Sequence, residues 1–149
     1  MANFLAIVLL FLILAFSCAD STNSSSHNCI LTPNWHMFVI NGLSNEVIIA
    51  HIRDEDGSFP KCSHCPIYPG GFVSWYFCPI GRWYYGDFTR GSTQKTVQLY
   101  SKHIDNFCGH KFLSGTEHCY WLVKPDGFYV AKKNLSISDP NWSYESPWI

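Results

Sequence analysis

The chain has 149 residues, of which 17% are aromatic and 14% are charged, and its formal net charge is −1. This length predicts a single domain. The ten basic residues are scattered, so they do not form the clustered basic face that a nucleic-acid-binding protein needs, and we expect no nucleic-acid partner. The many aromatic and few charged residues favour β-sheets, because broad rings pack well on a pleated surface.

The first 19 residues predict a signal peptide (1–19). Every residue from Phe4 to Phe16 is apolar, and Ser17-Cys18-Ala19 supplies the small residues that precede a cleavage site. The alternative, a membrane anchor, is too short, because a helix needs about 20 apolar residues to span a bilayer. We therefore expect a secreted, extracellular protein with no stable membrane insertion, whose mature chain begins with a loose Ser- and Asn-rich segment (20–34).

Seven cysteines become six once Cys18 leaves with the signal peptide. An even number in a secreted chain predicts up to three disulfides, and the count alone leaves their connectivity open. The six are Cys29, Cys62, Cys65, Cys78, Cys108 and Cys119. Three Asn-X-Ser sequons also fit export and predict N-glycosylation at Asn23, Asn134 and Asn141.

The domain begins with two predicted strands, Trp35–Ile40 and Val47–Ile52, which the turn signal Asn41-Gly42 would join into a first hairpin. The stretch from Pro60 to Gly71 contains too many prolines and glycines for regular structure, so we expect a long loop that its two cysteines fix to the body. Three further strands are predicted at Phe72–Cys78, Arg82–Phe88 and Thr96–Tyr100.

The clearest local signal is a hairpin near the end of the domain. Two runs of aromatic and β-branched residues, Tyr120–Val123 and Phe128–Val130, flank Pro125-Asp126-Gly127, which has the residues of a tight turn. We expect this hairpin to lie at the centre of a sheet. With about seven strands and no amphipathic helical run, the chain predicts an all-β, small antiparallel β-sandwich that is disulfide-stabilised. It would span residues 35–132 and leave a C-terminal tail (133–149).

Cys62-Ser63-His64-Cys65 has the spacing of a metal-binding or redox-active pair. Structural zinc needs four ligands, and a second set would have to come from His110, His118 and Cys119. A thioredoxin-like redox role needs a βαβ context that this sequence lacks. Because an oxidising compartment favours disulfides, we expect no metal and no cofactor.

Acidic and histidine residues offer two further kinds of chemistry, neither within a recognised motif. Asp54-Glu55-Asp56 carries oxygen ligands for calcium, but it lacks the spacing of an EF-hand and is typical of a solvated turn. A secreted ribonuclease uses histidines as general acid and base, but no catalytic motif surrounds any histidine here. We therefore expect no enzymatic activity. The candidate histidines are His51, His103, His110 and His118.

Several segments together form an ordered pattern. The chain carries Trp35–Leu43, Ile49–His51 and Asp54–Gly57, followed by five further segments: Trp75–Phe77, Tyr84–Phe88, Val97–Tyr100, Cys108 with Cys119–Trp121, and Asp126–Tyr129. This order resembles the plant self-incompatibility stigma proteins and their S-protein homologues. That family typically has a V-x-I-x-N-x-L strand, a second strand ending in His-Cys and an acidic D-D-D-L-G turn. The resemblance covers most of the mature chain.

The cysteines mark this chain as a divergent member of the family it resembles. Cys108 and Cys119 match two of the family's cysteine positions, so the resemblance implies that they pair. At the family's other two positions the chain has Ile52 and Gly86, and the absence of both is what the loss of one disulfide would look like. Cys29, Cys62, Cys65 and Cys78 stand outside the family pattern, and their pairing stays open.

The resemblance implies a non-enzymatic signalling or recognition ligand that binds a cell-surface receptor protein. Loops on a rigid scaffold suit recognition, so the expected contact surfaces are the loops Arg53–Gly57 and Thr89–Lys95. The residues expected to touch the partner are Arg53, Asp54, Glu55, Asp56, Arg90 and Lys95. The alternative is a secreted defence or antimicrobial protein whose aromatic surface stacks on sugars or enters membranes.

Overall fold

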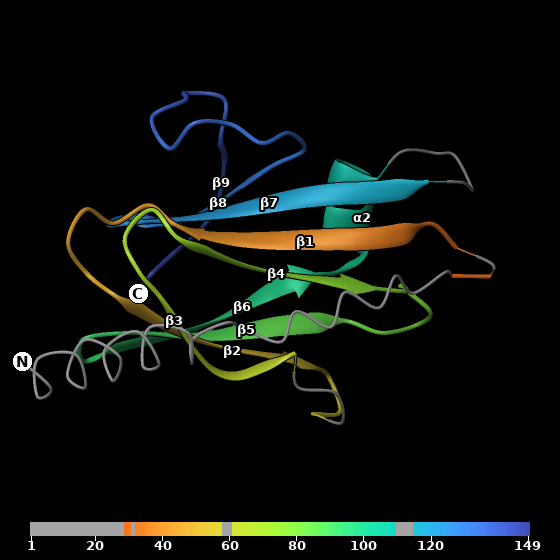
Figure 1. Cartoon of the computed structure of the whole chain (residues 1–149), viewed down its shortest axis with the longest axis horizontal. Helices are drawn as coiled ribbons and strands as arrows, with labels where there is room; N and C mark the ends of the chain where they lie inside the picture. The colour runs from red at the N-terminus through yellow and green to blue at the C-terminus, as the bar shows by residue number, and fades with distance from the viewer. Residues whose placement is uncertain (1–28, 31, 58–60, 110–114) are drawn as a thin grey trace, which may run out of the picture.

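The computed structural model describes residues 29–30, 32–57, 61–109 and 115–149. In these ranges, nine strands form two sheets that pack together as a sandwich (Figure 1). The predicted disulfide-stabilised all-β sandwich is therefore confirmed, with two strands more than the sequence suggested. The predicted signal peptide, the sequon at Asn23 and the candidate His110 lie outside the described residues.

The five-stranded sheet has the order β4-β1-β7-β8-β9. The predicted hairpin is its β7 and β8, and β7 is the central strand, as expected. β1 and β7 run parallel, which departs from the antiparallel arrangement predicted for the whole sandwich. The strand bounds are β1 Asn34–Asn41, β4 Phe72–Phe77, β7 Thr116–Lys124, β8 Gly127–Ala131 and β9 Ser143–Pro147.

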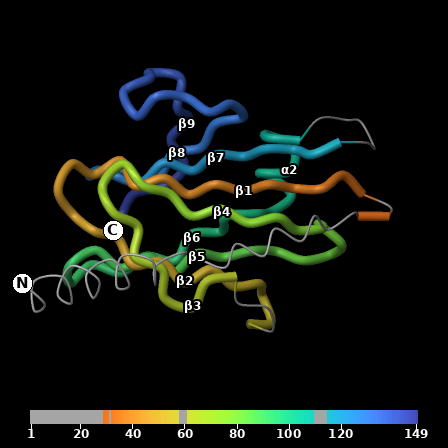
Figure 2. Tube along the Cα trace, viewed as in Figure 1, coloured from red at the N-terminus to blue at the C-terminus, as the bar shows by residue number. Residues whose placement is uncertain are grey.

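The four-stranded sheet has the order β3-β2-β5-β6, and its neighbouring strands are all antiparallel. Figure 2 shows β2, β3 and β5 side by side below β1, β4 and β7 in this view. The strand bounds are β2 Ile48–Asp54, β3 Cys62–Ile67, β5 Tyr84–Arg90 and β6 Thr93–Tyr100.

Side chains that alternate along the strands fill the space between the two sheets. In β1 the buried apolar residues are Trp35, Met37 and Val39, and in β2 every second residue is buried in the same way. The indole of Trp121 lies in this core and donates a hydrogen bond from Nε1 to the carbonyl oxygen of Leu99, 3.1 Å away, which links the two sheets. Burial of one face per strand leaves the opposite face of each sheet for other contacts.

The predicted hairpin between the first two strands is wrong, because β1 and β2 belong to different sheets. Both strands alternate apolar and polar residues, and this pattern fits two strands that pair as well as two strands that face each other across a core. Asn41 fixes the crossover between the sheets. Its buried amide donates to the carbonyl oxygens of Glu46 and Ile67, and its Oδ1 accepts from the backbone N–H of Leu43.

The stretch predicted as a long loop contains strand β3. It pairs only with β2 and forms an edge of its sheet, where a proline is tolerated because one side of the strand needs no hydrogen-bond partner.

Two other elements were missed by the sequence analysis. Helix α2, Lys102–Cys108, begins after Ser101, whose hydroxyl accepts from the backbone N–H of Ile104. Strand β9 lies within the segment predicted as a C-terminal tail.

Three disulfides join Cys29 to Cys78, Cys62 to Cys65 and Cys108 to Cys119. The Cys108–Cys119 bridge is the pair that the family resemblance implied. Cys108 and Cys119 are fully buried, whereas Cys65 lies half-buried on the edge strand β3. Within the described ranges, no helix is long and apolar enough to cross a bilayer.

Candidate functional site

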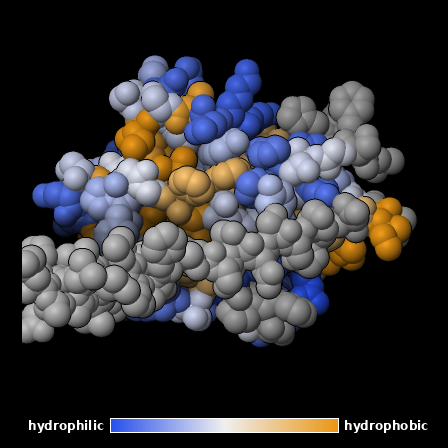
Figure 3. Space-filling model, viewed as in Figure 1, coloured by the Kyte–Doolittle hydropathy of each residue, from blue (hydrophilic) through white to orange (hydrophobic). Residues whose placement is uncertain are grey.

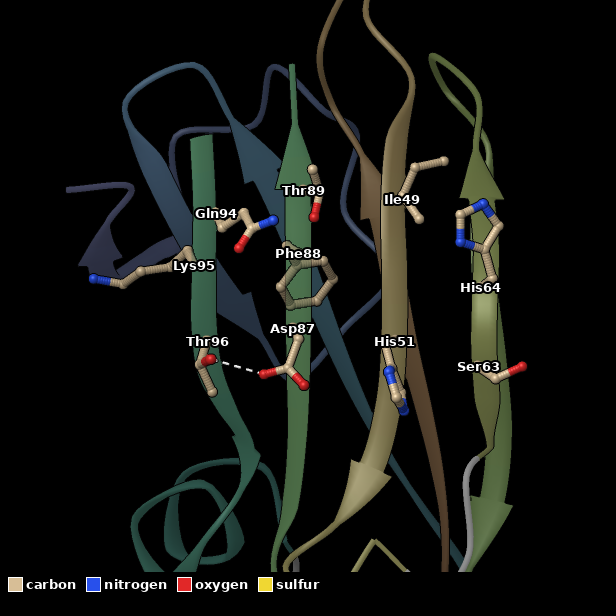
Figure 4. A pocket seen from close by; sticks show the side chains of 10 residues that line it. All are labelled: Ile49, His51, Ser63, His64, Asp87, Phe88, Thr89, Gln94, Lys95 and Thr96. Atoms are coloured by element: carbon tan, nitrogen blue, oxygen red, sulfur yellow. Dashed lines mark hydrogen bonds between the residues drawn. The ribbon is translucent and has the colours of Figure 1, made fainter. Parts of the chain in front are cut away.

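The outer face of the four-stranded sheet, which points away from the core, carries a shallow hollow of about 390 Å³ (Figure 4). All four strands of that sheet contribute to it, so the hollow lies on the flat of the sheet and not in the loops at its ends. It is lined by Ile49, His51, Ser63, His64, Asp87, Phe88, Thr89, Gln94, Lys95 and Thr96.

The pleat of the strands explains why polar side chains gather there. Because β2 buries Ile48, Ala50 and Ile52, its intervening residues point to the outer face. Cross-strand register then aligns the polar residues of neighbouring strands. His51 on β2 lies opposite Asp87 on β5, and Asp87 lies opposite Thr96 on β6. The sequence therefore builds a row of polar side chains across three strands.

Asp87 is the centre of a hydrogen-bond network in the hollow. Arg53 donates to it from Nε at 2.8 Å and from Nη2 at 3.3 Å, and the Thr96 hydroxyl donates at 2.7 Å. The hydrogen bond from Arg53 lowers the pKa of Asp87 and outweighs the opposing effect of burial, and the Thr96 hydroxyl and the charge of Arg53 add to the lowering. The Asp87 carboxylate is therefore held as an anion in a fixed orientation.

Arg53 is held on a second side by an aromatic ring. Its guanidinium carbon lies 5.3 Å from the centroid of the Tyr85 ring, within the range of a cation–π interaction. The Tyr85 hydroxyl in turn accepts a hydrogen bond from Gln98 Nε2 at 3.2 Å. Hydrogen bonding to Asp87 raises the pKa of Arg53, which stays positively charged. The polar groups around the hollow are thus ordered before any partner binds.

A β-bulge shapes the edge of the hollow at strand β3. Ala50 pairs with Cys65 and Ile52 pairs with Cys62, so a step of two residues on β2 faces a step of three on β3. The Cys62–Cys65 disulfide spans this bulge, where the two Cα atoms are 5.8 Å apart instead of the roughly 10 Å of an uninterrupted strand. The two residues between the cysteines, Ser63 and His64, line the hollow. The C-x-x-C motif therefore has a local structural role here.

The structure divides the residues that were predicted to contact a partner. Lys95 lines the hollow, Arg53 borders it through Asp87, and Glu55 and Asp56 are exposed in the turn after β2. Asp54, in contrast, is buried, and its carboxylate pairs with Arg82 at 2.9 Å. Asp54 therefore stabilises the fold instead of offering a free surface charge.

The loop placement of these residues is also corrected. Arg53 and Asp54 belong to β2, Arg90 belongs to β5 and Lys95 belongs to β6. Of the two predicted loops, only residues 55–57 and the tight turn at 91–92 lie outside strands. Arg90 pairs with Glu46 at 2.6 Å, and its guanidinium lies over the ring of Trp148, which gives this side chain a role in the fold. The surface available to a partner is a sheet face more than a set of loops.

The candidate catalytic histidines lie on separate surfaces. His51 faces the hollow, whereas His103 on α2 lies 3.4 Å from the carboxylate of Glu145. His118 is on the outer face of the other sheet. In the two sequons within the described ranges, the acceptor residues Asn134 and Asn141 are exposed.

That second outer face carries a group of rings, here called the ring cluster. His36 is its centre: its ring lies 3.8 Å from that of Tyr76, 4.0 Å from that of Phe38 and 5.6 Å from that of His118, measured between centroids. Burial, followed by the charge of His118, lowers the pKa of His36 to about 4. The members of the cluster are His36, Phe38, Phe72, Tyr76, His118 and Tyr120.

The ring cluster is partly open to solvent. Phe72 is 62% exposed and Tyr76 is 36% exposed, and Figure 3 shows hydrophobic side chains near the middle of the visible face, over β1 and β7. Next to it, the segment between β8 and β9 covers the rest of this sheet face, where Trp142 packs with Leu122 and Ala131. The ring cluster is thus the uncovered remainder of a larger apolar face.

Sequence reasoning missed most of the residues that form the hollow and the ring cluster, and it selected Lys95, His51 and His118 without placing them on the outer faces of the sheets. The signal was present in the alternation of the strands, since each predicted inward face implies an outward one. It was not usable without knowledge of which strands are neighbours, because Asp87 meets Arg53 from 34 positions away. Comparisons of the chain with protein-family models, with curated proteins and with solved structures found no match.

Proposed function

We propose that this protein is a secreted, non-enzymatic recognition ligand, similar to the plant self-incompatibility S-proteins, and that it binds a cell-surface receptor protein through the hollow on the four-stranded sheet. The observation that carries the proposal is the ordered network of Arg53, Asp87 and Thr96 on an open sheet face. Polar groups that are already fixed lose little conformational entropy when a partner binds, which favours specific recognition.

The positions of two missing cysteines support the family resemblance. Ile52 on β2 and Gly86 on β5, which stand where the family has cysteines, lie directly opposite each other. A disulfide between these two positions would therefore join neighbouring strands. In this chain the side chains of Phe88 and Leu99 occupy the space beside Gly86, where a Cβ atom would approach them to within 2.8 Å or less.

Secretion is supported by the disulfides. Three disulfides in one small domain are compatible with an extracellular protein, because such bonds persist in oxidising environments. The apolar leader and the exposed sequons at Asn134 and Asn141 point in the same direction.

Binding of the labelled protein to intact plant cells tests this function. We expect saturable binding, and we expect Lys95→Glu to weaken it at least tenfold, because Lys95 lies on β6 at the rim of the hollow and this change reverses its charge (Figure 4). The matched control is Lys133→Glu, the same change at an exposed position outside the hollow. Equal binding by both variants, with thermal unfolding unchanged, would show that the hollow is not the contact surface.

The ring cluster supports a second candidate function, a secreted defence or antimicrobial protein. Phe72 and Tyr76 expose large aromatic surfaces on the sheet face opposite the hollow. Such rings can enter a membrane surface or stack on sugars. A growth-inhibition assay with the folded protein tests this function: we expect Phe72→Ser to reduce inhibition and Lys95→Glu to leave it unchanged. Inhibition that depends on Lys95 and not on Phe72 would contradict it.

A further inference from the structure

Two histidines of the ring cluster come from neighbouring strands and face each other directly. His36 on β1 and His118 on β7 are register partners in the parallel pair of strands. Both lie on the outer face, because their sequence neighbours Trp35, Met37 and Cys119 point into the core. The centroids of the two imidazoles are 5.6 Å apart. We infer that His36 and His118 together bind one divalent late transition-metal ion, with Cu²⁺ bound most tightly.

The spacing of the rings fits two ligands on one ion. Metal–imidazole bonds are about 2.0–2.1 Å long, and the ring centroid lies about 1 Å beyond the nitrogen. Two imidazoles on one ion therefore have centroids about 4.4 Å apart at the right angle of a square-planar Cu²⁺ site and about 5–5.5 Å apart at tetrahedral to trigonal angles. The observed 5.6 Å between His36 and His118 lies just beyond these spacings, so binding requires the two rings to approach each other. Rotation of the His118 ring, whose nearest ring neighbour is His36 itself, provides this movement.

The surroundings hold the rings and leave their nitrogens to a ligand. His36 is stacked on Tyr76 at 21° between ring planes and packs against Phe38 on its other side, which restricts its rotation. His118 lies nearly parallel to Phe38 and Tyr120, at 17° and 12°. Among the described residues, no hydrogen bond engages either imidazole. Rings that are already oriented need little reorganisation to bind an ion.

The chemistry of the ligands selects the metal. Neutral imidazole suits copper, zinc and nickel, and copper gives the most stable complexes among the divalent ions of this series. In the part of the chain that the structure describes, no group of three or more His, Cys, Asp or Glu side chains could hold a metal ion. His36 and His118 therefore form a two-ligand site, in which water completes the coordination of the ion.

Other histidines provide matched controls. His64 is exposed at the edge of the hollow, on the other sheet, and His103 lies beside Glu145. Neither has a second imidazole as its register partner. A His→Gln change at either position removes one metal-binding side chain from the surface and leaves the pair of His36 and His118 intact.

Titration of the full secreted protein with Cu²⁺ tests the inference, with calorimetry for affinity and electron paramagnetic resonance for the ligands. We expect one tight site with two nitrogen ligands in its spectrum. His118→Gln should weaken Cu²⁺ binding at least tenfold and leave a single-nitrogen spectrum, whereas His64→Gln and His103→Gln should change the affinity by less than twofold. Zn²⁺ should bind more weakly than Cu²⁺, and His118→Gln should weaken Zn²⁺ binding more than His64→Gln or His103→Gln does.

A second measurement makes the test independent of variant folding. In the unchanged protein, substoichiometric Cu²⁺ should broaden the imidazole proton signals of His36 and His118 in NMR spectra before those of the other histidines. Preferential broadening at His51 or His64, or Cu²⁺ affinity that His118→Gln does not change, would overturn the inference. The outcome is independent of receptor binding through the hollow, which is on the other sheet.

Discussion

The two outer faces of this sandwich are built in different ways. On the four-stranded sheet, a charged network of Arg53, Asp87 and Thr96 lies on an open surface. On the five-stranded sheet, rings stack on one another, and a segment that ends at Trp142 covers the adjoining apolar area. The first face is ordered by directional hydrogen bonds and the second by packing. Directional contacts favour specificity for one partner, whereas packed rings contribute more to stability.

Two of the three disulfides lie beside different sheets, and the largest expected effect distinguishes these two bonds. Cys29 and Cys78 are 49 positions apart and fasten the end of β4, whereas Cys62 and Cys65 are 3 apart on β3. Replacing the first pair with serines should lower the free energy of unfolding by about 4 kcal/mol and the second by about 2 kcal/mol, because a shorter loop restricts the unfolded chain less. Urea unfolding followed by tryptophan fluorescence measures both.

Equal losses for the two pairs would contradict this explanation. The Cys62–Cys65 variant has a second readout, since it removes the bond across the bulge that carries Ser63 and His64. Binding through the hollow should therefore fall more for this variant than for the Cys29–Cys78 variant, although its loss of stability is smaller.

The next largest loss of stability is expected from a change in the segment between β8 and β9, which covers part of the five-stranded sheet. Trp142 is 6% exposed, packs on Leu122 and Ala131, and donates from Nε1 to the carbonyl oxygen of Ser136 at 2.8 Å. Trp142→Ala should lower the free energy of unfolding by about 3 kcal/mol, because it removes a large buried ring and one of the two hydrogen bonds to that carbonyl, the other coming from the backbone N–H of Asp139. Thermal unfolding at several urea concentrations measures the change.

The control for this variant is Tyr144→Ala. Tyr144 is 52% exposed and follows the same covering segment, so its removal should cost less than about 1 kcal/mol. Similar losses for the two variants would mean that Trp142 does not anchor the segment. The contrast between the area that the Trp142 segment covers and the uncovered ring cluster would then not hold.

Local sequence signals predicted the sandwich well and its pairing poorly. The hairpin of β7 and β8 was predictable because its turn residues, Pro125-Asp126-Gly127, determine the connection within a few positions. The pairing of β1 with β7 was not, because it depends on which distant strand shares a sheet with Trp35–Ile40. Edge strand β3 was missed because its prolines and glycines are typical of loops, and only its pairing with β2 orders it.

The same limit applies to the candidate site. Arg53 and Lys95 were selected from the sequence for their expected place in exposed loops, and both lie at or beside the hollow, but on strands. Asp87 and Thr96 could not be selected, since their roles come from side chains on other strands. Asp54 was selected for its charge, yet burial beside Arg82 gives it a structural role.

Acid titration tests how much the charge of Asp87, in the hollow, contributes to the stability of the fold. The pKa of Asp87 is lowered in the folded protein, so the carboxylate stabilises the fold above its unfolded pKa of about 3.9, and this contribution is lost as the pH falls through the lower folded value. Asp87→Asn should cost about 1 kcal/mol at pH 7, because the ion pair with Arg53 is about one-third exposed and partly screened by water.

Urea unfolding at pH 7 and below pH 3 measures this difference. The gap between the unchanged protein and Asp87→Asn should shrink at acidic pH, whereas Asp56→Asn, at an exposed position in the turn after β2, should show almost no gap at either pH. A gap that stays constant on acidification would mean that the carboxylate charge does not hold Arg53 in place.

The smallest expected effect is the coupling energy between two stacked rings of the ring cluster. It tests which rings of the cluster can contact a ligand. The rings of Phe38 and Tyr120 are 4.6 Å apart and 13° from parallel, so each occupies one face of the other. A double-mutant cycle with Phe38→Leu and Tyr120→Leu should give a coupling energy of about 0.5–1 kcal/mol, as expected for a stacked pair. Such coupling would leave mainly the exposed ring of Phe72 for a sugar or membrane. Coupling near zero would mean that the rings of Phe38 and Tyr120 do not stabilise each other. A ligand could then separate the two rings at little cost in stability, and the defence function would gain support over recognition through the hollow.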